Sequence, residues 1–295
     1  MKIDEIIKYP PNTLSDDQRH FYFENGYLLL ESAVEENWLK RLRAVTDEMI
    51  EFSRSITISD AIWDIEKDHG FENPRLRRLT SPNDQSDTYW EFASSSLITD
   101  IVADLVGPDV KFHHSKLNFK WAHGGEEVKW HQDIQFWPHT NYSPLTVGLY
   151  LYDCRPEQGP LVVLPKSHRH DLYDQYNESG EWIGCLNVDD ASNLDTTNAT
   201  ELSGPAGSLT IHNCRTLHSS MPNRSPVGRP LLLNAYSSAD AMPYTPVPTP
   251  SSFYQTIVRG KTARWAHHDD RPCQIPPDWS GGYTSIFALQ QEEAM

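Results

Sequence analysis

Long apolar runs are absent from this sequence: no segment approaches the roughly 18 apolar residues that a membrane-spanning helix needs. The first residues, Met1 to Glu5, also lack the basic stretch and apolar core of a secretory signal. Both absences favour a soluble, cytoplasmic protein without a membrane partner.

Cysteine and basic charge are also scarce. The 295 residues include only 4 cysteines and no Cys-x-x-Cys pair, which favours reduced thiols over a disulfide framework. Lys and Arg number 25 against 41 Asp and Glu, so the net charge is −16. An acidic surface repels phosphate groups. This argues against a nucleic-acid partner and slightly disfavours a coenzyme A thioester as the substrate.

Apolar residues make up 38% of the chain, enough for one large core, and no internal repeat is present. A single domain is therefore expected. Ser15 followed by Gln18 is the signature of a helix start, and Gly26 of a helix end. The patterns predict further helices over 35–53, 89–106 and 253–261, and strands over 27–30, 112–120 and 145–152.

From Val110 onward the sequence is rich in β-strand patterns. Side chains alternate with period 2 along a strand. Four polar residues of the strand over 112–120 therefore share one face: His114, Lys116, Asn118 and Lys120. Polar residues along one face of a core strand indicate a lined cavity.

The stretch His131-Gln132-Asp133 carries the most specific chemistry. On a strand, His131 and Asp133 project to the same face. One imidazole beside one carboxylate makes two-thirds of the facial triad that binds non-haem Fe(II). The third ligand must come from further along the chain, where His212 and His218 are the alternatives.

The motifs around this stretch resemble one known family. His131-Gln132-Asp133, the run from Gly159 to His168, and His218 followed eleven residues later by Arg229 are similar to the phytanoyl-CoA dioxygenase family, which includes ectoine hydroxylase. The likeness spans roughly residues 14 to 240. It implies a mainly β fold with flanking helices, namely a double-stranded β-helix or jelly roll of the cupin type.

The resemblance also implies a plan for the single oxygenase domain, 1–295. Residues 1–109 would form helical support packed on one sheet, and 110–240 the jelly-roll core. The irregular stretch 171–200 is expected to be a lid-like insertion, and 241–295 to wrap around the core.

Family members use Fe(II), with 2-oxoglutarate and O2 as cosubstrates. By resemblance, the iron ligands are His131, Asp133 and His218, because His218 leaves the arginine at the family spacing whereas His212 does not. Arg229 would pair with the far carboxylate of 2-oxoglutarate. The other expected contacts of this cosubstrate are Asn118, Ser220 and Thr146.

The reaction implied is hydroxylation of an unactivated carbon of a small organic molecule, with release of succinate and CO2. Family halogenases replace the carboxylate at Asp133 with a small residue, so its presence favours hydroxylation. Desaturation, cyclisation or an acyl-CoA substrate would use the same cofactors. A non-catalytic cupin-like metal-binding protein is the alternative from another class. The chain is expected to be a monomer or a homodimer.

Substrate contacts are predicted from residue type and position alone. The four candidates flank the metal strand or the variable elements of the family: Gln135, Trp137, Lys116 and Arg77. Amide, aromatic and cationic groups together suit a small polar molecule that is amino-acid-like or carboxylated. For Arg77, a salt-bridged surface position is the simpler alternative.

Overall fold

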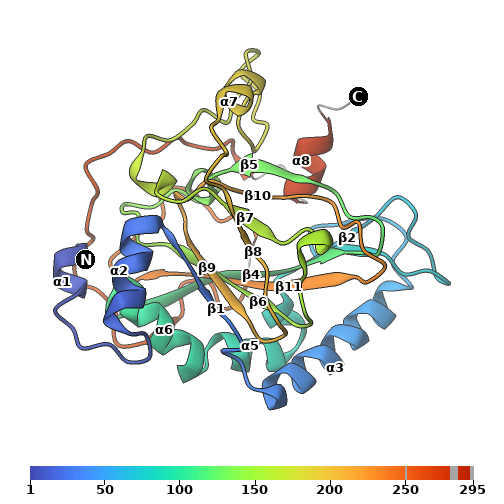
Figure 1. Ribbon diagram of the computed structural model, residues 1–295, viewed down its shortest axis with the longest axis horizontal. Coiled ribbons are helices and arrows are strands. Elements are labelled where there is room, and N and C mark those ends of the chain that lie inside the picture. Colours follow the sequence, from blue (N-terminus) through green and yellow to red (C-terminus); the bar gives the residue numbers. More distant parts are fainter. Residues whose placement is uncertain (250, 280–284, 293–295) are drawn as a thin grey trace.

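Two antiparallel sheets stacked on each other form a jelly roll (Figure 1). The computed structural model describes residues 1–249, 251–279 and 285–292. The large sheet has the order β1 (Tyr27–Leu30), β9 (Leu209–Asn213), β6 (Leu145–Tyr150), β11 (Arg229–Ser238), β4 (Val110–Lys120), β3 (Leu76–Thr80) and β2 (Trp63–Ile65), and β12 (Ile257–Arg259) also pairs with β4. The small sheet has the order β5 (Val128–His131), β10 (His218–Ser220), β7 (Leu161–Val163) and β8 (Thr200–Leu202). The predicted fold class is confirmed.

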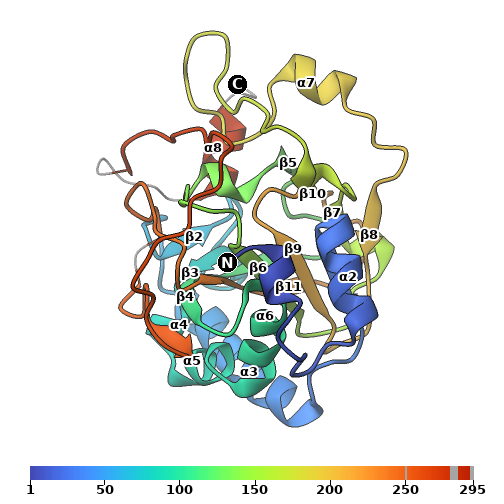
Figure 2. The ribbon, with the colours of Figure 1, turned by 90° about the vertical axis from the view of Figure 1, so that its left-hand side faces the viewer.

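Helices cover the face of the large sheet that points away from the small sheet, where α3, α5 and α6 lie side by side (Figures 1 and 2). The helices are α1 (Ile3–Ile6), α2 (Asp16–Asn25), α3 (Glu36–Ser53), α4 (Pro82–Gln85), α5 (Asp87–Ala93), α6 (Ser96–Val106), α7 (Val188–Asn193) and α8 (Ile286–Glu292). Short 3-10 helices are η1 (Asp133–Gln135), η2 (Pro156–Gln158) and η3 (Ser167–Arg169). The main apolar core lies between the large sheet and the helices that cover it, chiefly α3, α5 and α6.

Among the elements that the sequence patterns predicted, two differ in the structure. The helix predicted over 89–106 is interrupted, because the hydroxyls of Ser94 and Ser95 donate to the carbonyl groups of Trp90 and Phe92 and end α5. The helix predicted over 253–261 is wrong, because this stretch contains strand β12, which pairs with β4.

Of the predicted insertion 171–200, the structure shows helix α7 and otherwise irregular chain. No helix of the described residues is long and apolar enough to cross a membrane.

Gly26 links the N-terminal helix to the strands that carry the histidines. Its φ of 82° lies in the left-handed region, and its carbonyl oxygen accepts hydrogen bonds from the Thr216 hydroxyl at 2.8 Å and the Asn213 amide at 2.9 Å. A Cβ atom added at Gly26 would lie 2.6 Å from the Thr216 Oγ1 atom and against the His168 ring. Glycine is therefore required both by the backbone and by the packing.

We expect Gly26→Ala to lower the free energy of unfolding, by about 1–2 kcal/mol for the left-handed backbone and about 1–3 kcal/mol for overpacking. Gly180→Ala is a matched control, because Gly180 also has a positive φ of 77° but open space around its Cα. Urea unfolding of the two variants measures both losses. Equal losses would contradict the packing role of Gly26.

Candidate active site

Antiparallel pairing of β5 with β10 brings two histidines together. His131 and His218 are directly opposite each other in this register. Directly opposite residues of neighbouring strands hold their side chains close together, and the two ring centroids are 4.1 Å apart. Both residues are buried. The pair therefore results from the strand register of the small sheet, although 87 positions separate the two histidines (218 − 131 = 87).

Asp133 joins this pair by a different route from the one predicted. Strand β5 ends at His131, and Asp133 begins the 3-10 helix η1, so strand alternation does not apply to it. The turn nevertheless places the Asp133 Oδ1 atom 3.8 Å from the Nε2 atom of His131 and 3.8 Å from that of His218. Ligand atoms of the three residues all lie within 4.8 Å of one another, which suits one metal ion.

Hydrogen bonds to the backbone orient both imidazoles. The Nδ1 atom of His131 lies 2.8 Å from the Lys129 carbonyl oxygen, and that of His218 lies 2.9 Å from the Thr216 carbonyl oxygen. A carbonyl oxygen only accepts, so each Nδ1 carries the proton and each Nε2 keeps its lone pair for a metal. The donor set therefore consists of two neutral imidazoles and one carboxylate.

The second oxygen of Asp133 is held by other residues. Its Oδ2 atom accepts a hydrogen bond from the Thr146 hydroxyl at 3.0 Å and lies 3.3 Å from the His212 Nε2 atom. The Oδ1 atom is left to face His131 and His218. His212 therefore supports the carboxylate rather than joining the three residues grouped around the metal position.

Electrostatics keep the three groups ready for a cation. Burial opposes ionisation of Asp133, but Lys116, His218 and His212 outweigh it and hold its pKa well below the usual value. Burial lowers the pKa of His131 to about 4 and that of His218 well below its usual value. The histidines are thus neutral and the carboxylate is charged at neutral pH, which is the protonation state that metal binding requires.

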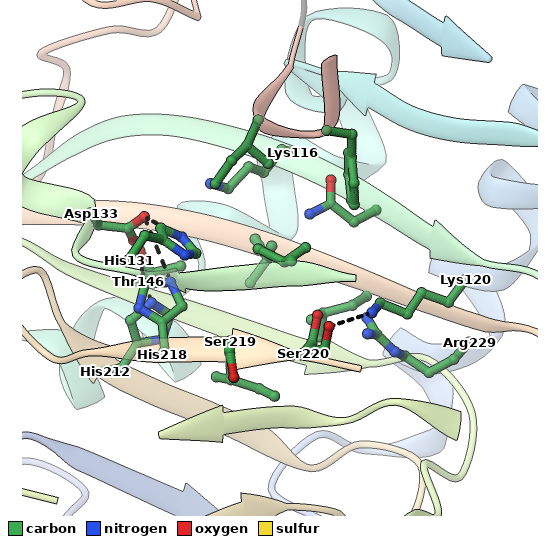
Figure 3. A pocket seen from close by; sticks show the side chains of 17 residues that line it. Lys116, Lys120, His131, Asp133, Thr146, His212, His218, Ser219, Ser220 and Arg229 are labelled. Atoms are coloured by element: carbon green, nitrogen blue, oxygen red, sulfur yellow. Dashed lines mark hydrogen bonds and ion pairs between the residues drawn. The ribbon is translucent and has the colours of Figure 1, made fainter. Parts of the chain in front are cut away.

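A cavity of about 600 Å³ extends from these residues between the two sheets. Figure 3 shows His131, Asp133 and His218 at one end of it and Lys120 with Arg229 at the other. Arg229 and Lys120 lie opposite each other on β11 and β4. Val128, Leu161, Leu231, Leu233, Ile286 and Phe287 supply apolar walls.

Polar atoms at the far end of this cavity lack partners. Among the described residues, the buried Nε atom of Arg229 and the Oδ1 atom of Asn118 have no hydrogen-bond partner. Arg229 uses Nη2 to donate to the Gly159 carbonyl oxygen at 2.6 Å, and Lys120 donates to the Ser220 carbonyl oxygen at 3.0 Å. Burial and the nearby Arg229 lower the pKa of Lys120 to about 6. Without an anion nearby, the Lys120 amine is therefore mostly uncharged at neutral pH, and a bound anion would favour its charged form. A buried guanidinium beside this amine, together with unsatisfied polar atoms, fits an anionic ligand.

Several predicted residues do line this cavity. Lys116, Asn118 and Lys120 line it from one face of β4, as the strand pattern indicated, and Ser220 and Arg229 line it as well. Thr146 also lines it, but its hydroxyl donates to Asp133, so the structure gives it a different partner from the expected cosubstrate.

Two predicted substrate residues are corrected. Arg77 does not line the cavity: its guanidinium pairs with Asp64 at 2.6 Å and Glu126 at 2.9 Å, as the salt-bridged alternative expected, although the residue is buried and not on the surface. Gln135 lies in η1 and not on a strand, and its fully buried amide donates to the Tyr173 carbonyl oxygen at 2.6 Å and to Gln274 at 2.8 Å. Both side chains support the structure around the site.

Trp137 faces a second, smaller cavity of about 290 Å³. This cavity shares Lys116, Asp133 and Ile286 with the larger one. Sequence reasoning missed Ile286 and Phe287, which reach the site from the C-terminal helix α8. No motif in the C-terminal segment pointed to them, since their role depends on tertiary packing. No residue of 171–200 lines either cavity within the described part of the chain.

A jelly roll that brings two histidines and one carboxylate together beside open space defines a non-haem iron oxygenase. Residues 22–231 match the family described as phytanoyl-CoA dioxygenase. The chain belongs to the phytanoyl-CoA dioxygenase family, and it is an enzyme that uses Fe(II) and 2-oxoglutarate.

Similar proteins agree with this assignment. A probable alpha-ketoglutarate-dependent hypophosphite dioxygenase of Stutzerimonas stutzeri is 31% identical over 93% of this chain and 96% of its own length. An ectoine dioxygenase of Bordetella parapertussis is 25% identical over 78% of this chain and 77% of its own. The crystal structure of EctD from S. alaskensis with 2-oxoglutarate and 5-hydroxyectoine has a TM-score of 0.69 at 20% identity, covering 88% of this chain and 89% of that chain. The structural likeness confirms the fold.

His218→Ala is expected to abolish stoichiometric iron binding, because it removes one of the grouped nitrogen atoms. His212→Ala should still bind one iron, about tenfold to a hundredfold more weakly, since it only supports Asp133. Anaerobic iron titration with metal analysis of the desalted protein measures both. Retention of iron by His218→Ala together with its loss from His212→Ala would exchange the two assignments.

Proposed function

We propose that His131, Asp133 and His218 bind the catalytic Fe(II), and that 2-oxoglutarate lies along the 600 Å³ cavity with its far carboxylate at Arg229 and Lys120. The observation that supports this most is the pair of buried basic side chains, Arg229 and Lys120, at the end of a cavity that begins at the proposed iron ligands. Asn118 and Ser220 line the same stretch and would contact the cosubstrate.

The chemistry of the cavity favours a dicarboxylate. A buried guanidinium is costly unless an anion pairs with it, and the lowered pKa of the neighbouring Lys120 reflects the same lack of an anion. A guanidinium forms a planar fork that matches a carboxylate, and its unpaired Nε atom in this structure is one prong of that fork. A non-catalytic metal-binding protein has no need for such a second anion site. The enzyme alternative is therefore the better supported one.

Iron and 2-oxoglutarate supply the oxidising chemistry: 2-oxoglutarate loses CO2 to become succinate, and one oxygen atom of O2 enters the substrate. The protein's own residues bind, orient and exclude water. Thr146 and His212 fix one oxygen of Asp133, so that the other faces the iron ligands. The apolar side chains of Leu231, Ile286 and Phe287 keep the cavity dry.

For the substrate, we propose a small molecule, with hypophosphite as the first compound to test. The relative from Stutzerimonas stutzeri whose name specifies hypophosphite matches this chain over nearly its whole length. Hydroxylation would convert one P–H bond of hypophosphite to P–OH and give phosphite. One atom of O2 then ends in phosphite and the other in succinate, so that atoms and electrons balance.

Succinate release from 2-oxoglutarate, measured with iron and O2 in the presence and absence of hypophosphite, tests this function. We expect succinate release that depends on iron and is stimulated by hypophosphite, with one phosphite formed per succinate. Asp133→Ala is the control and should give neither product, because the only anionic ligand is lost. An iron-loaded wild-type enzyme that released no succinate with any small substrate would contradict the proposal.

Arg229→Ala is expected to weaken 2-oxoglutarate binding. Loss of one partner of a buried ion pair costs about 3–5 kcal/mol, which corresponds to roughly two to three orders of magnitude in affinity. Arg229→Lys should restore only part of this loss, since a point charge does not reproduce the fork. Iron affinity should change little. Titration of 2-oxoglutarate into the iron-loaded protein without oxygen, followed by the absorption of the iron chelate, measures the effect. Unchanged affinity would remove Arg229 from the cosubstrate site.

A further inference from the structure

The smaller cavity, of about 290 Å³, carries a second cluster of basic side chains next to Asp133. Its polar lining consists of Arg78, His114, Lys116, Thr249 and Asp133. Phe136, Trp137, Pro248 and Ile286 form the apolar remainder. Among the described residues of this lining, basic groups therefore outnumber carboxylates, and the one carboxylate named there, Asp133, is a proposed iron ligand.

Lys116 is the central residue of this cluster. It lines both cavities. It is close enough to Asp133 to lower the pKa of that carboxyl. Its ammonium group makes no hydrogen bond or ion pair with any residue in the described ranges. An ammonium group has three donors to satisfy. When Asp133 is bound to a cation, its charge is shared with that cation and compensates Lys116 less.

Two other side chains add hydrogen-bond donors to the wall of this cavity. Arg78 is only 1% exposed and contributes a second positive charge to the wall. Thr249 is 3% exposed, and its hydroxyl has no hydrogen-bond partner in the part of the chain that the structure describes. A buried hydroxyl without a partner is rare in folded proteins. Ammonium, guanidinium and hydroxyl together provide the donors that an oxyanion accepts.

The size and place of the cavity restrict the ligand further. It is the smaller of the two cavities that share Asp133, and the aromatic rings of Phe136 and Trp137 line it. Its lining includes Asp133, so that a molecule inside it lies beside the proposed iron ligands. A ligand of a few heavy atoms fits this space, whereas a nucleotide or an acyl thioester does not.

We propose that Lys116, Arg78 and Thr249 form the substrate subsite and bind a small monovalent oxyanion, of which hypophosphite is the representative. This inference rests on the proposed function and deepens it, because it names the chemical class of the substrate and the residues that select it. The cavity at Arg229 and Lys120 then takes the dicarboxylate, and the cavity at Lys116 takes the substrate anion.

Calorimetric titration of hypophosphite into the iron-loaded, 2-oxoglutarate-bound enzyme without oxygen tests the subsite. Lys116→Met should raise the dissociation constant of hypophosphite at least tenfold, the range for a lost hydrogen bond to a charged group. Thr249→Val should raise the same dissociation constant about twofold to tenfold. This second variant still tests the subsite if Lys116→Met does not fold. Lys40→Met, which removes the same charge from the exposed surface of α3, is the matched control and should leave the constant unchanged.

A second readout separates the two binding sites. Lys120→Met should weaken 2-oxoglutarate, seen in the absorption of the iron chelate, and leave hypophosphite affinity unchanged, whereas Lys116→Met should do the reverse. Equal hypophosphite affinity in wild type and Lys116→Met would overturn the subsite, as would loss of 2-oxoglutarate affinity alone in Lys116→Met.

The failure of the subsite and the failure of the proposed function are distinguishable. Normal 2-oxoglutarate binding in a wild-type protein that does not bind hypophosphite would overturn the subsite alone. If no iron chelate forms with 2-oxoglutarate, the proposed function fails. In that case, the ³¹P resonance of hypophosphite is measured with the metal-free protein. Broadening that is lost in Lys116→Met and kept in Lys40→Met would still support the subsite. No broadening by the wild-type protein would overturn it.

Discussion

The site depends on the buried carboxylate of Asp133, because its two oxygen atoms have different partners. Asp133 has no solvent to stabilise its charge, so the surrounding protein must do so. Thr146 and His212 hold one oxygen atom, while the other faces His131 and His218. The strand register of the small sheet and the large sheet's β6 and β9 must both be correct for this arrangement. The jelly roll therefore places the Asp133 carboxylate between its two sheets, where side chains from both sheets contact it.

Asp133 lines both cavities, and each cavity has its own set of basic side chains. On one side, apolar walls lead to the neighbouring basic side chains of Lys120 and Arg229. On the other, aromatic walls enclose Lys116 and Arg78. Although the protein has a net charge of −16, buried basic side chains gather in the two cavities beside Asp133. In the proposed function, each set of basic groups selects a different anion, and Ile286 of helix α8 lines both cavities.

The jelly-roll fold was implied by the family resemblance, and local sequence patterns predicted several helices and strands, whereas long-range packing explains what these patterns missed. Period-2 alternation placed Lys116, Asn118 and Lys120 on one cavity-lining face, since alternation depends only on neighbouring residues. The same rule failed for Gln135, because the chain leaves the strand at Gln132. Arg77 was misassigned because its partners, Asp64 and Glu126, lie on other segments. Ile286 carried no local signal of its role.

The central claim is that one cavity holds iron at His131, Asp133 and His218 and the far carboxylate of 2-oxoglutarate at Arg229 and Lys120. A crystal structure of the iron-loaded protein, grown with 2-oxoglutarate in the absence of oxygen, tests this claim most directly. The account predicts one iron ion bonded to those three residues and a 2-oxoglutarate molecule whose far carboxylate contacts Arg229. Iron at another set of residues, or 2-oxoglutarate with no carboxylate at Arg229, would contradict it.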